Sequence, residues 1–191
     1  MPSPLGHALA GLATAWGADA VNGTRRRAPR RSVDSLTVAC VVLAAIPDVD
    51  LLFHAHRSFT HSVTAVALVL IISAAVTGQV TSERRWRVSG TCAAAYATHL
   101  LLDWLATDTY FPYGIQALWP FSREWFISGW NLFPQTERLR LFSRSTIETN
   151  LIAMAWEAAL LTPIVVVAWL VRVKALAGLP AKVAGSHEAA Q

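Results

Sequence analysis

The sequence predicts an all-α fold, a multi-pass bundle of about five helices with a long aromatic loop before the last one. Of the 191 residues, 54% are hydrophobic and only 15% are charged, whereas soluble domains carry about 25% charged residues. Apolar segments recur along the chain, and no hairpin turn flanks the β-branched stretch 164–167. We expect one membrane-associated domain over residues 1–178 and a polar tail over 179–191. A compact soluble helical core with an apolar surface is the alternative.

Five apolar segments define the predicted helices. In chain order they are Leu5 to Val21, Leu36 to Phe53, Val63 to Thr77, Val88 to Leu105 and Ile147 to Val171. The last four approach the roughly 20 residues with which a helix crosses the hydrocarbon of a bilayer. The first is rich in alanine and glycine, so we expect it to be interfacial or buried. Pro163 is expected to kink the fifth.

Basic and aromatic residues give the bundle an orientation. Arginines gather at 25–31 and at 84–87, between apolar segments, which is typical of cytoplasmic loops. The loop from Asp108 to Arg144 is then external. Between Trp104 and Phe133 lie 10 of the 18 aromatic residues, as at a membrane–water interface; a packed loop core is an equal alternative. The positive net charge of +4 is explained by the arginine runs in these loops between apolar segments. We therefore predict no nucleic-acid partner.

An up-and-down bundle brings most of the ionisable side chains of the apolar segments to one end. These are His7, Asp48, Asp50, His54, His56, His61, His99, Asp103 and Glu148. Imidazole nitrogens and carboxylate oxygens suit zinc, manganese or iron. Ionisable groups in or near a membrane are costly to bury, so a cluster of them predicts a functional site. The two cysteines, Cys40 and Cys92, lie within apolar stretches and are expected to be buried and unpaired.

Local spacing shows how these groups can meet. His99 and Asp103 are four residues apart and share one helix face. Asp48 and Asp50 converge only if the second helix ends near Pro47. Ser58 or Thr60 is a natural N-cap for the third helix, which would place His61 in its first turn. Taken singly, the His99–Asp103 spacing also fits a hydrogen-bonded pair, and the two aspartates fit a helix cap.

Four ordered motifs carry a resemblance to a known family. They are Gly6-His7, Pro47-Asp48-Val49-Asp50, the run from His56 to Ser62, and the run from His99 to Asp103; a later segment, Gly114 to Phe121, also matches. Over about residues 5–125 the chain resembles the LexA-regulated metal-dependent hydrolases of the bacterial inner membrane. That family is distantly similar to zinc-dependent phospholipase C and the P1-type nucleases, which are all-helical and hydrolyse phosphodiesters.

The resemblance implies a ligand set and a chemistry. The implied metal ligands are His7, Asp48, His61, His99 and Asp103, followed by Asp50 and His56. The implied cofactor is a divalent metal, zinc as one or two ions, with manganese or magnesium as alternatives.

Hydrolysis by a metal-activated water would use Asp50 or Asp103 as general base, and Arg57 would hold a substrate phosphate. The expected function is a membrane-bound hydrolase of a phosphoester lipid or similar amphiphile. The alternative is a non-enzymatic membrane protein that binds or transports a divalent metal. The sequence leaves the oligomeric state open.

Overall fold

The computed structural model describes residues 1–21, 34–53, 57–138, 140 and 142–177. Within those ranges the fold is all-α, as predicted, and no strand is assigned. The elements are α1 (Pro4–Val21), α2 (Ser35–Ala45), the 3-10 segments η1 (Ile46–Phe53) and η2 (Phe59–His61), α3 (Val63–Val76), α4 (Ser82–Leu105) and α5 (Arg144–Ala177). Predictions for the arginine run at 25–31, for His54 and His56, and for the tail lie outside the described residues.

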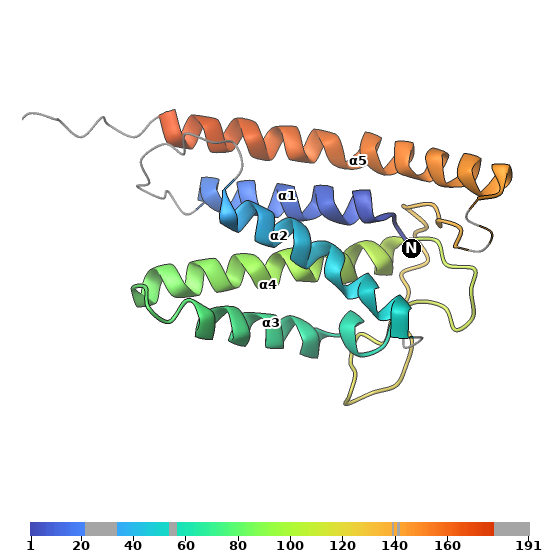
Figure 1. Cartoon of the computed structure of the whole chain (residues 1–191), viewed down its shortest axis with the longest axis horizontal. Helices are drawn as coiled ribbons and strands as arrows, with labels where there is room; N and C mark the ends of the chain where they lie inside the picture. Colours follow the sequence, from blue (N-terminus) through green and yellow to red (C-terminus); the bar gives the residue numbers. More distant parts are fainter. Residues whose placement is uncertain (22–33, 54–56, 139, 141, 178–191) are drawn as a thin grey trace, which may run out of the picture.

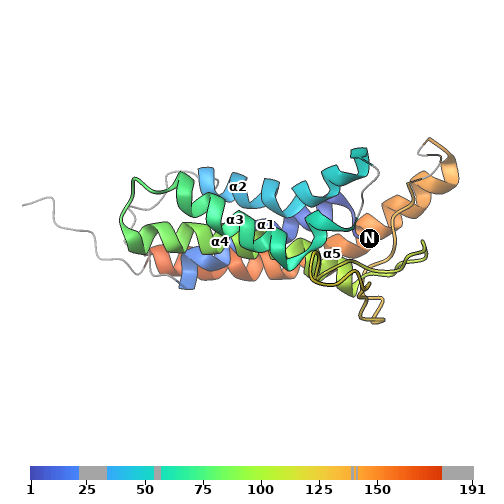
Figure 2. The ribbon, with the colours of Figure 1, turned by 90° about the horizontal axis from the view of Figure 1, so that it is seen from below.

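The helices run side by side, with α5 at one edge and α3 at the other (Figures 1 and 2). Between them, α1 packs against α5, α2 and α4, and α4 packs against α2 and α3. The start of the chain, the two 3-10 segments and the loop between α4 and α5 all gather at the same end of the bundle (Figure 1). This loop-bearing end is where the sequence predicts the ionisable cluster.

Small side chains let the three central helices approach closely. Ala15, Cys40 and Ala95 form a buried cluster where α1, α2 and α4 meet. A Cβ atom added at Gly11 would lie 2.5 Å from the backbone oxygen of Cys40, so only glycine fits there. Cys40 and Cys92 are buried and free, which confirms their predicted role as small apolar core residues.

The two short 3-10 segments set the entry to the site. α2 ends at Ala45 and continues as η1, which confirms the predicted break near Pro47. The predicted cap of the third helix is wrong. Ser62 is the N-cap of α3 and accepts a hydrogen bond from the Ala65 amide at 3.2 Å, whereas the Thr60 hydroxyl bonds to Asp50. His61 therefore precedes α3, in η2.

One described helix is long and apolar enough to cross a bilayer. It spans Arg144–Lys174, and its most apolar 18-residue window has a mean hydropathy of 2.1 with only 28% of that window buried. A core helix of a soluble protein would be mostly buried, so the exposure of α5 favours lipid contact. α3 is apolar but has only 14 residues. Crossing by several helices therefore stays a prediction.

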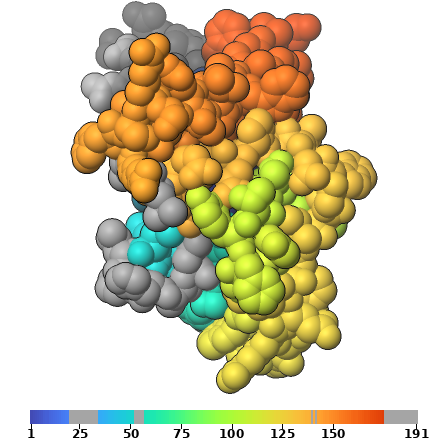
Figure 3. Space-filling model, turned by 90° about the vertical axis from the view of Figure 1, so that its right-hand side faces the viewer, coloured from blue at the N-terminus to red at the C-terminus, as the bar shows by residue number. Residues whose placement is uncertain are grey.

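The aromatic loop both packs on the bundle and projects from it. Ile115 and Phe133 are buried against the helices, whereas Phe111, Phe121 and Trp130 are 85%, 91% and 76% exposed. Figure 3 shows this end of the molecule, where loop residues coloured lime, yellow and orange lie beside the cyan segment that follows α2. The packed loop core is thus confirmed for buried residues such as Phe133, whereas an interfacial position of the exposed rings stays a prediction.

Candidate metal centre

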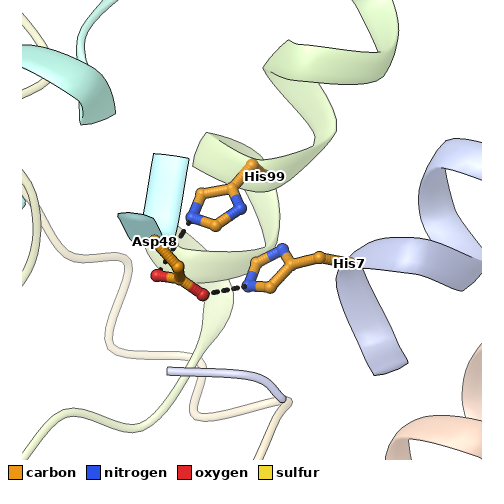
Figure 4. Close-up of side chains that lie close together, drawn as sticks. All are labelled: His7, Asp48 and His99. Atoms are coloured by element: carbon orange, nitrogen blue, oxygen red, sulfur yellow. Dashed lines mark ion pairs between the residues drawn. The ribbon is translucent and has the colours of Figure 1, made fainter. Parts of the chain in front are cut away.

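Five predicted side chains converge at the loop-bearing end. His7 comes from α1, Asp48 from η1, His61 from η2, and His99 and Asp103 from α4. We call these five residues the metal cluster. Figure 4 shows His7, Asp48 and His99 facing one another from three separate elements. The three histidines are fully buried and Asp103 is 3% exposed, while the Asp48 side chain is 18% exposed. Access from outside is therefore by way of Asp48.

The inward atoms are spaced as ligands of one ion would be. His61 Nε2 and His99 Nε2 lie 3.0 Å apart. Asp103 Oδ2 lies 3.2 Å from the first and 3.5 Å from the second, and Asp48 Oδ1 lies 3.8 and 3.6 Å from them. Ligands about 2.0–2.1 Å from a tetrahedral zinc ion are separated by about 3.3 Å. These four atoms are close to that spacing.

His7 lies on the other side of the two carboxylates. Its Nε2 is 3.6 Å from Asp103 Oδ1 and 4.0 Å from Asp48 Oδ2, and its ring stacks on His99 with centroids 3.7 Å apart. Each carboxylate thus turns one oxygen to His7 and the other to the pair formed by His61 and His99. These residues would thus hold one or two divalent ions.

Contacts behind the histidines fix which nitrogen faces the centre. His99 Nδ1 lies 2.7 Å from the Ala44 carbonyl oxygen, which only accepts, so Nδ1 carries the hydrogen. His61 Nδ1 lies 3.2 Å from Asp50 Oδ2, which assigns its hydrogen in the same way. Both Nε2 lone pairs then point at each other, and they repel unless a proton or a cation lies between them. Such outer contacts orient metal-binding histidines in known sites.

Asp50 lies behind His61 and outside the set of inward atoms. Its Oδ2 accepts hydrogen bonds from the Thr60 hydroxyl and from the Arg57 amide, the latter at 3.1 Å. The sequence predicted Asp50 as a ligand and as a possible base, whereas its described contacts are those of a group that orients the imidazole of His61.

Arg57 is buried and already paired. Its Nη1 forms an ion pair with Asp108, and its Nε donates to the Met1 sulfur at 3.3 Å. The residue is 5% exposed and has a φ of 67°, a left-handed conformation that is uncommon for non-glycine residues. The Arg57 side chain is therefore neither solvated nor unpaired.

Polar atoms left without hydrogen bonds test the fit of a metal. Among the described residues, both ring nitrogens of His7, both oxygens of Asp103 and Oδ1 of Asp48 are buried and make no hydrogen bond. Buried polar groups are almost always hydrogen-bonded, so the gathering of these atoms in one cluster indicates a missing partner. The N and O donor set suits zinc or manganese. The residues present therefore fit a divalent ion.

The charge balance of the cluster favours a cation. Burial disfavours charge on both groups, yet the adjacent imidazoles of His61 and His99 hold the pKa of the Asp48 carboxyl below its ordinary value. Burial is likewise outweighed at His61, where the nearby carboxylates of Asp103, Asp48 and Asp50 raise the pKa of the imidazole. In both cases the charged form is favoured despite burial. The carboxylates therefore stay negative, and the site attracts positive charge.

A buried glutamate that the sequence analysis missed anchors the start of α1. Glu157, fully buried on α5, accepts hydrogen bonds from the Ser3 amide at 2.8 Å and from the Ser3 hydroxyl. A Cβ at Gly6 would lie 2.6 Å from Glu157 Oε2. The glycine next to His7 therefore lets α1 approach Glu157 closely, which fixes the position of His7. The available signal in the sequence was the position of Glu157, an acidic residue inside a long apolar segment. Glu148, by contrast, pairs with Arg144 at 2.7 Å on the surface.

Comparison with known proteins assigns the family. A family model described as YdjM inner membrane protein matches residues 1–177, which is nearly the whole chain. The chain belongs to the YdjM inner membrane protein family. No curated protein and no solved structure matches it. Family membership supports an inner-membrane location, in keeping with the exposed apolar surface of α5.

Proposed function

We propose that the protein is a multi-pass inner-membrane hydrolase that uses a divalent metal to cleave a phosphoester in a lipid or similar amphiphile. The observation that carries the proposal is the convergence of three imidazoles and two carboxylates from four elements, with two Nε2 atoms 3.0 Å apart. Zinc is the proposed ion, as one or two per chain, with manganese or magnesium as alternatives. A bound ion of this kind lowers the pKa of a water molecule to about 7 and polarises a phosphoryl oxygen.

The residues of the chain divide the remaining work. His61, His99 and Asp103 would hold the ion, with Asp48 and His7 completing its surroundings. Asp103 Oδ1 makes no hydrogen bond and is the proposed acceptor of the proton released from water. Asp50 already accepts bonds from Thr60 and Arg57, which favours a positioning role behind His61.

Two features support an amphiphilic substrate. The exposed apolar surface of α5 is available to acyl chains, and exposed rings, including Phe111 and Trp130, lie in the loop that packs on the same end as the cluster. Aromatic rings of this kind favour the membrane–water interface. A lipid headgroup would thus reach the cluster at the level where its phosphate resides.

Metal content and turnover test the proposal together. We expect detergent-purified protein to retain zinc through dialysis and to hydrolyse bis(p-nitrophenyl) phosphate or a short-chain phospholipid. His99→Ala should lose both properties, while the exposed Arg123→Gln control should keep them. Absence of any bound transition metal in folded protein would contradict the proposal and leave only structural polar pairs.

A metal-binding or metal-transporting protein without catalysis is the second candidate. The complete burial of His7, His61 and His99 favours it, because a deeply enclosed ion meets substrate less easily. Bound zinc without turnover of any phosphoester, together with loss of folding in both His99→Ala and Asp48→Ala, would support this second candidate over the hydrolase.

A further inference from the structure

Two arginine side chains meet at the sulfur of Met1. Arg57 and Arg138 come from segments 81 positions apart, yet both donate to the sulfur of Met1. Arg57 also lies one hydrogen bond from Asp50, which contacts His61. Two guanidinium groups held side by side beside a cation site form a surface for an anion.

Only one of the two has its charge balanced. Arg57 is buried in an ion pair with Asp108, so its charge already has a partner of opposite sign. Breaking such a buried pair is costly. Arg57 therefore serves the fold, because it connects the segment before η2 to the loop after α4.

Arg138 keeps most of its donors available. A guanidinium has five N–H groups, and the one hydrogen bond of the Arg138 side chain in the described chain goes to the Met1 sulfur, a weak acceptor. No described carboxylate forms an ion pair with it. The other guanidinium nitrogens of Arg138 make no hydrogen bond with the described residues, and they are not buried. They therefore reach the surface, although the side chain as a whole is half-buried.

Carboxylates of the metal cluster contribute to the electrostatic surroundings of Arg138. Burial and then the neighbouring Arg57 charge lower the pKa of Arg138, while Asp48, Asp103 and Asp108 act in the opposite direction. Two of those three carboxylates belong to the metal cluster. Once a divalent ion balances them, the positive charge of Arg138 is left without an anion.

We propose that Arg138 binds the anionic oxygen atoms of the substrate, a phosphate ester, beside the metal cluster. The position of this anion site rests on the proposed function, but its chemistry follows from the free donors of Arg138. A planar guanidinium binds two phosphate oxygens through parallel N–H···O bonds, which a lysine ammonium does not reproduce. Arg138 takes the phosphate-binding role that the sequence analysis gave to Arg57.

Phosphate titration of zinc-loaded and zinc-free protein tests this site. Inorganic phosphate would be titrated calorimetrically into the wild type and the variants Arg138→Gln, Arg138→Lys and Arg123→Gln, with zinc content measured in each. We expect Arg138→Gln to lower phosphate affinity at least about tenfold, because it removes a charged hydrogen-bonding group. Arg138→Lys should fall between, Arg123→Gln should match the wild type, and zinc content should be equal in all four.

The outcomes separate this inference from the proposed function. Equal phosphate affinity in the wild type and in Arg138→Gln, or equal losses in Arg138→Gln and Arg123→Gln, would overturn the anion site. Failure of the wild type to bind zinc would contradict the hydrolase, and the zinc-free titration would still decide the role of Arg138. Short-chain phosphatidic acid in place of phosphate separates a lipid headgroup from the free anion: tighter binding that still depends on Arg138 supports a lipid substrate.

Discussion

At the residue scale, two carboxylates contact His61 from opposite sides. Asp103 faces Nε2, on the side of the cluster, and Asp50 faces Nδ1, behind the ring. Ligands and their outer partners have different effects when they are lost, since removal of an outer partner costs about 10–100-fold in metal affinity. The two positions therefore provide a matched pair of variants.

We predict a graded loss of zinc affinity. Asp103→Asn should weaken binding by more than about a hundredfold, because it removes an inward charge, and Asp50→Asn by about tenfold to a hundredfold. Competition with a chromogenic chelator measures both. Equal losses would contradict the assignment of Asp50 to the outer layer, and an Asp50→Asn effect larger than that of Asp103→Asn would reverse the two roles.

Most of the cluster could be predicted from sequence because its residue types are rare in this chain. An up-and-down bundle is predicted to bring five of the six histidines near one end, and His99 and Asp103 share a helix face by spacing alone. The side on which Asp50 lies could not be predicted, because it depends on the turn in which Arg57 has a positive φ. Asp108 and Glu157 were missed since their partners are distant in sequence.

At the element scale, α3 and α5 form the two edges of the bundle and expose apolar side chains. Ile71 on α3 is 62% exposed and Val167 on α5 is 59% exposed. The five helices could be predicted from apolar runs, and the observed bounds differ mainly at their polar ends. Hydropathy alone could not predict whether both α3 and α5 contact lipid, because α3 is apolar but shorter than a bilayer-spanning helix.

We predict that a lysine at either edge reduces membrane insertion. A lysine at the centre of a spanning helix costs about 2.5–3.5 kcal/mol, so Val167→Lys and Ile71→Lys should each lower the fraction of chain that resists alkaline carbonate extraction. Glu148→Lys, at the polar end of α5, is the control. An effect at Val167 but not at Ile71 would restrict the membrane contact to α5 and contradict multiple crossings.

At the scale of the whole molecule, polar contacts tie the bundle together at both ends. The metal cluster joins α1, η1, η2 and α4 at one end. At the other, the buried Arg172 Nε lies 2.9 Å from Asp19 Oδ2, and its Nη2 lies 3.9 Å from Asp34. An ion held at the first end would join four elements that come from separate parts of the chain.

We predict that removing the metal lowers the thermal stability of the protein. A ligand at a hundred times its Kd stabilises the native state by about 2.7 kcal/mol, which corresponds to roughly 5–10 °C in Tm for a chain of this size. Scanning calorimetry with and without EDTA measures the shift. Arg172→Leu should lower Tm while leaving zinc content unchanged. An unchanged Tm after proven metal removal would show that the ion does not support the fold.

The bond between Ser3 and Glu157 joins residues 154 positions apart, and it has a consequence for biosynthesis. His7 emerges from the ribosome long before Glu157, the acid that anchors its helix. Until α5 has been made and has packed against α1, one side of the cluster has no fixed position. Metal loading should therefore follow completion of the last helix, and nascent chains arrested before Glu157 should capture the ion poorly.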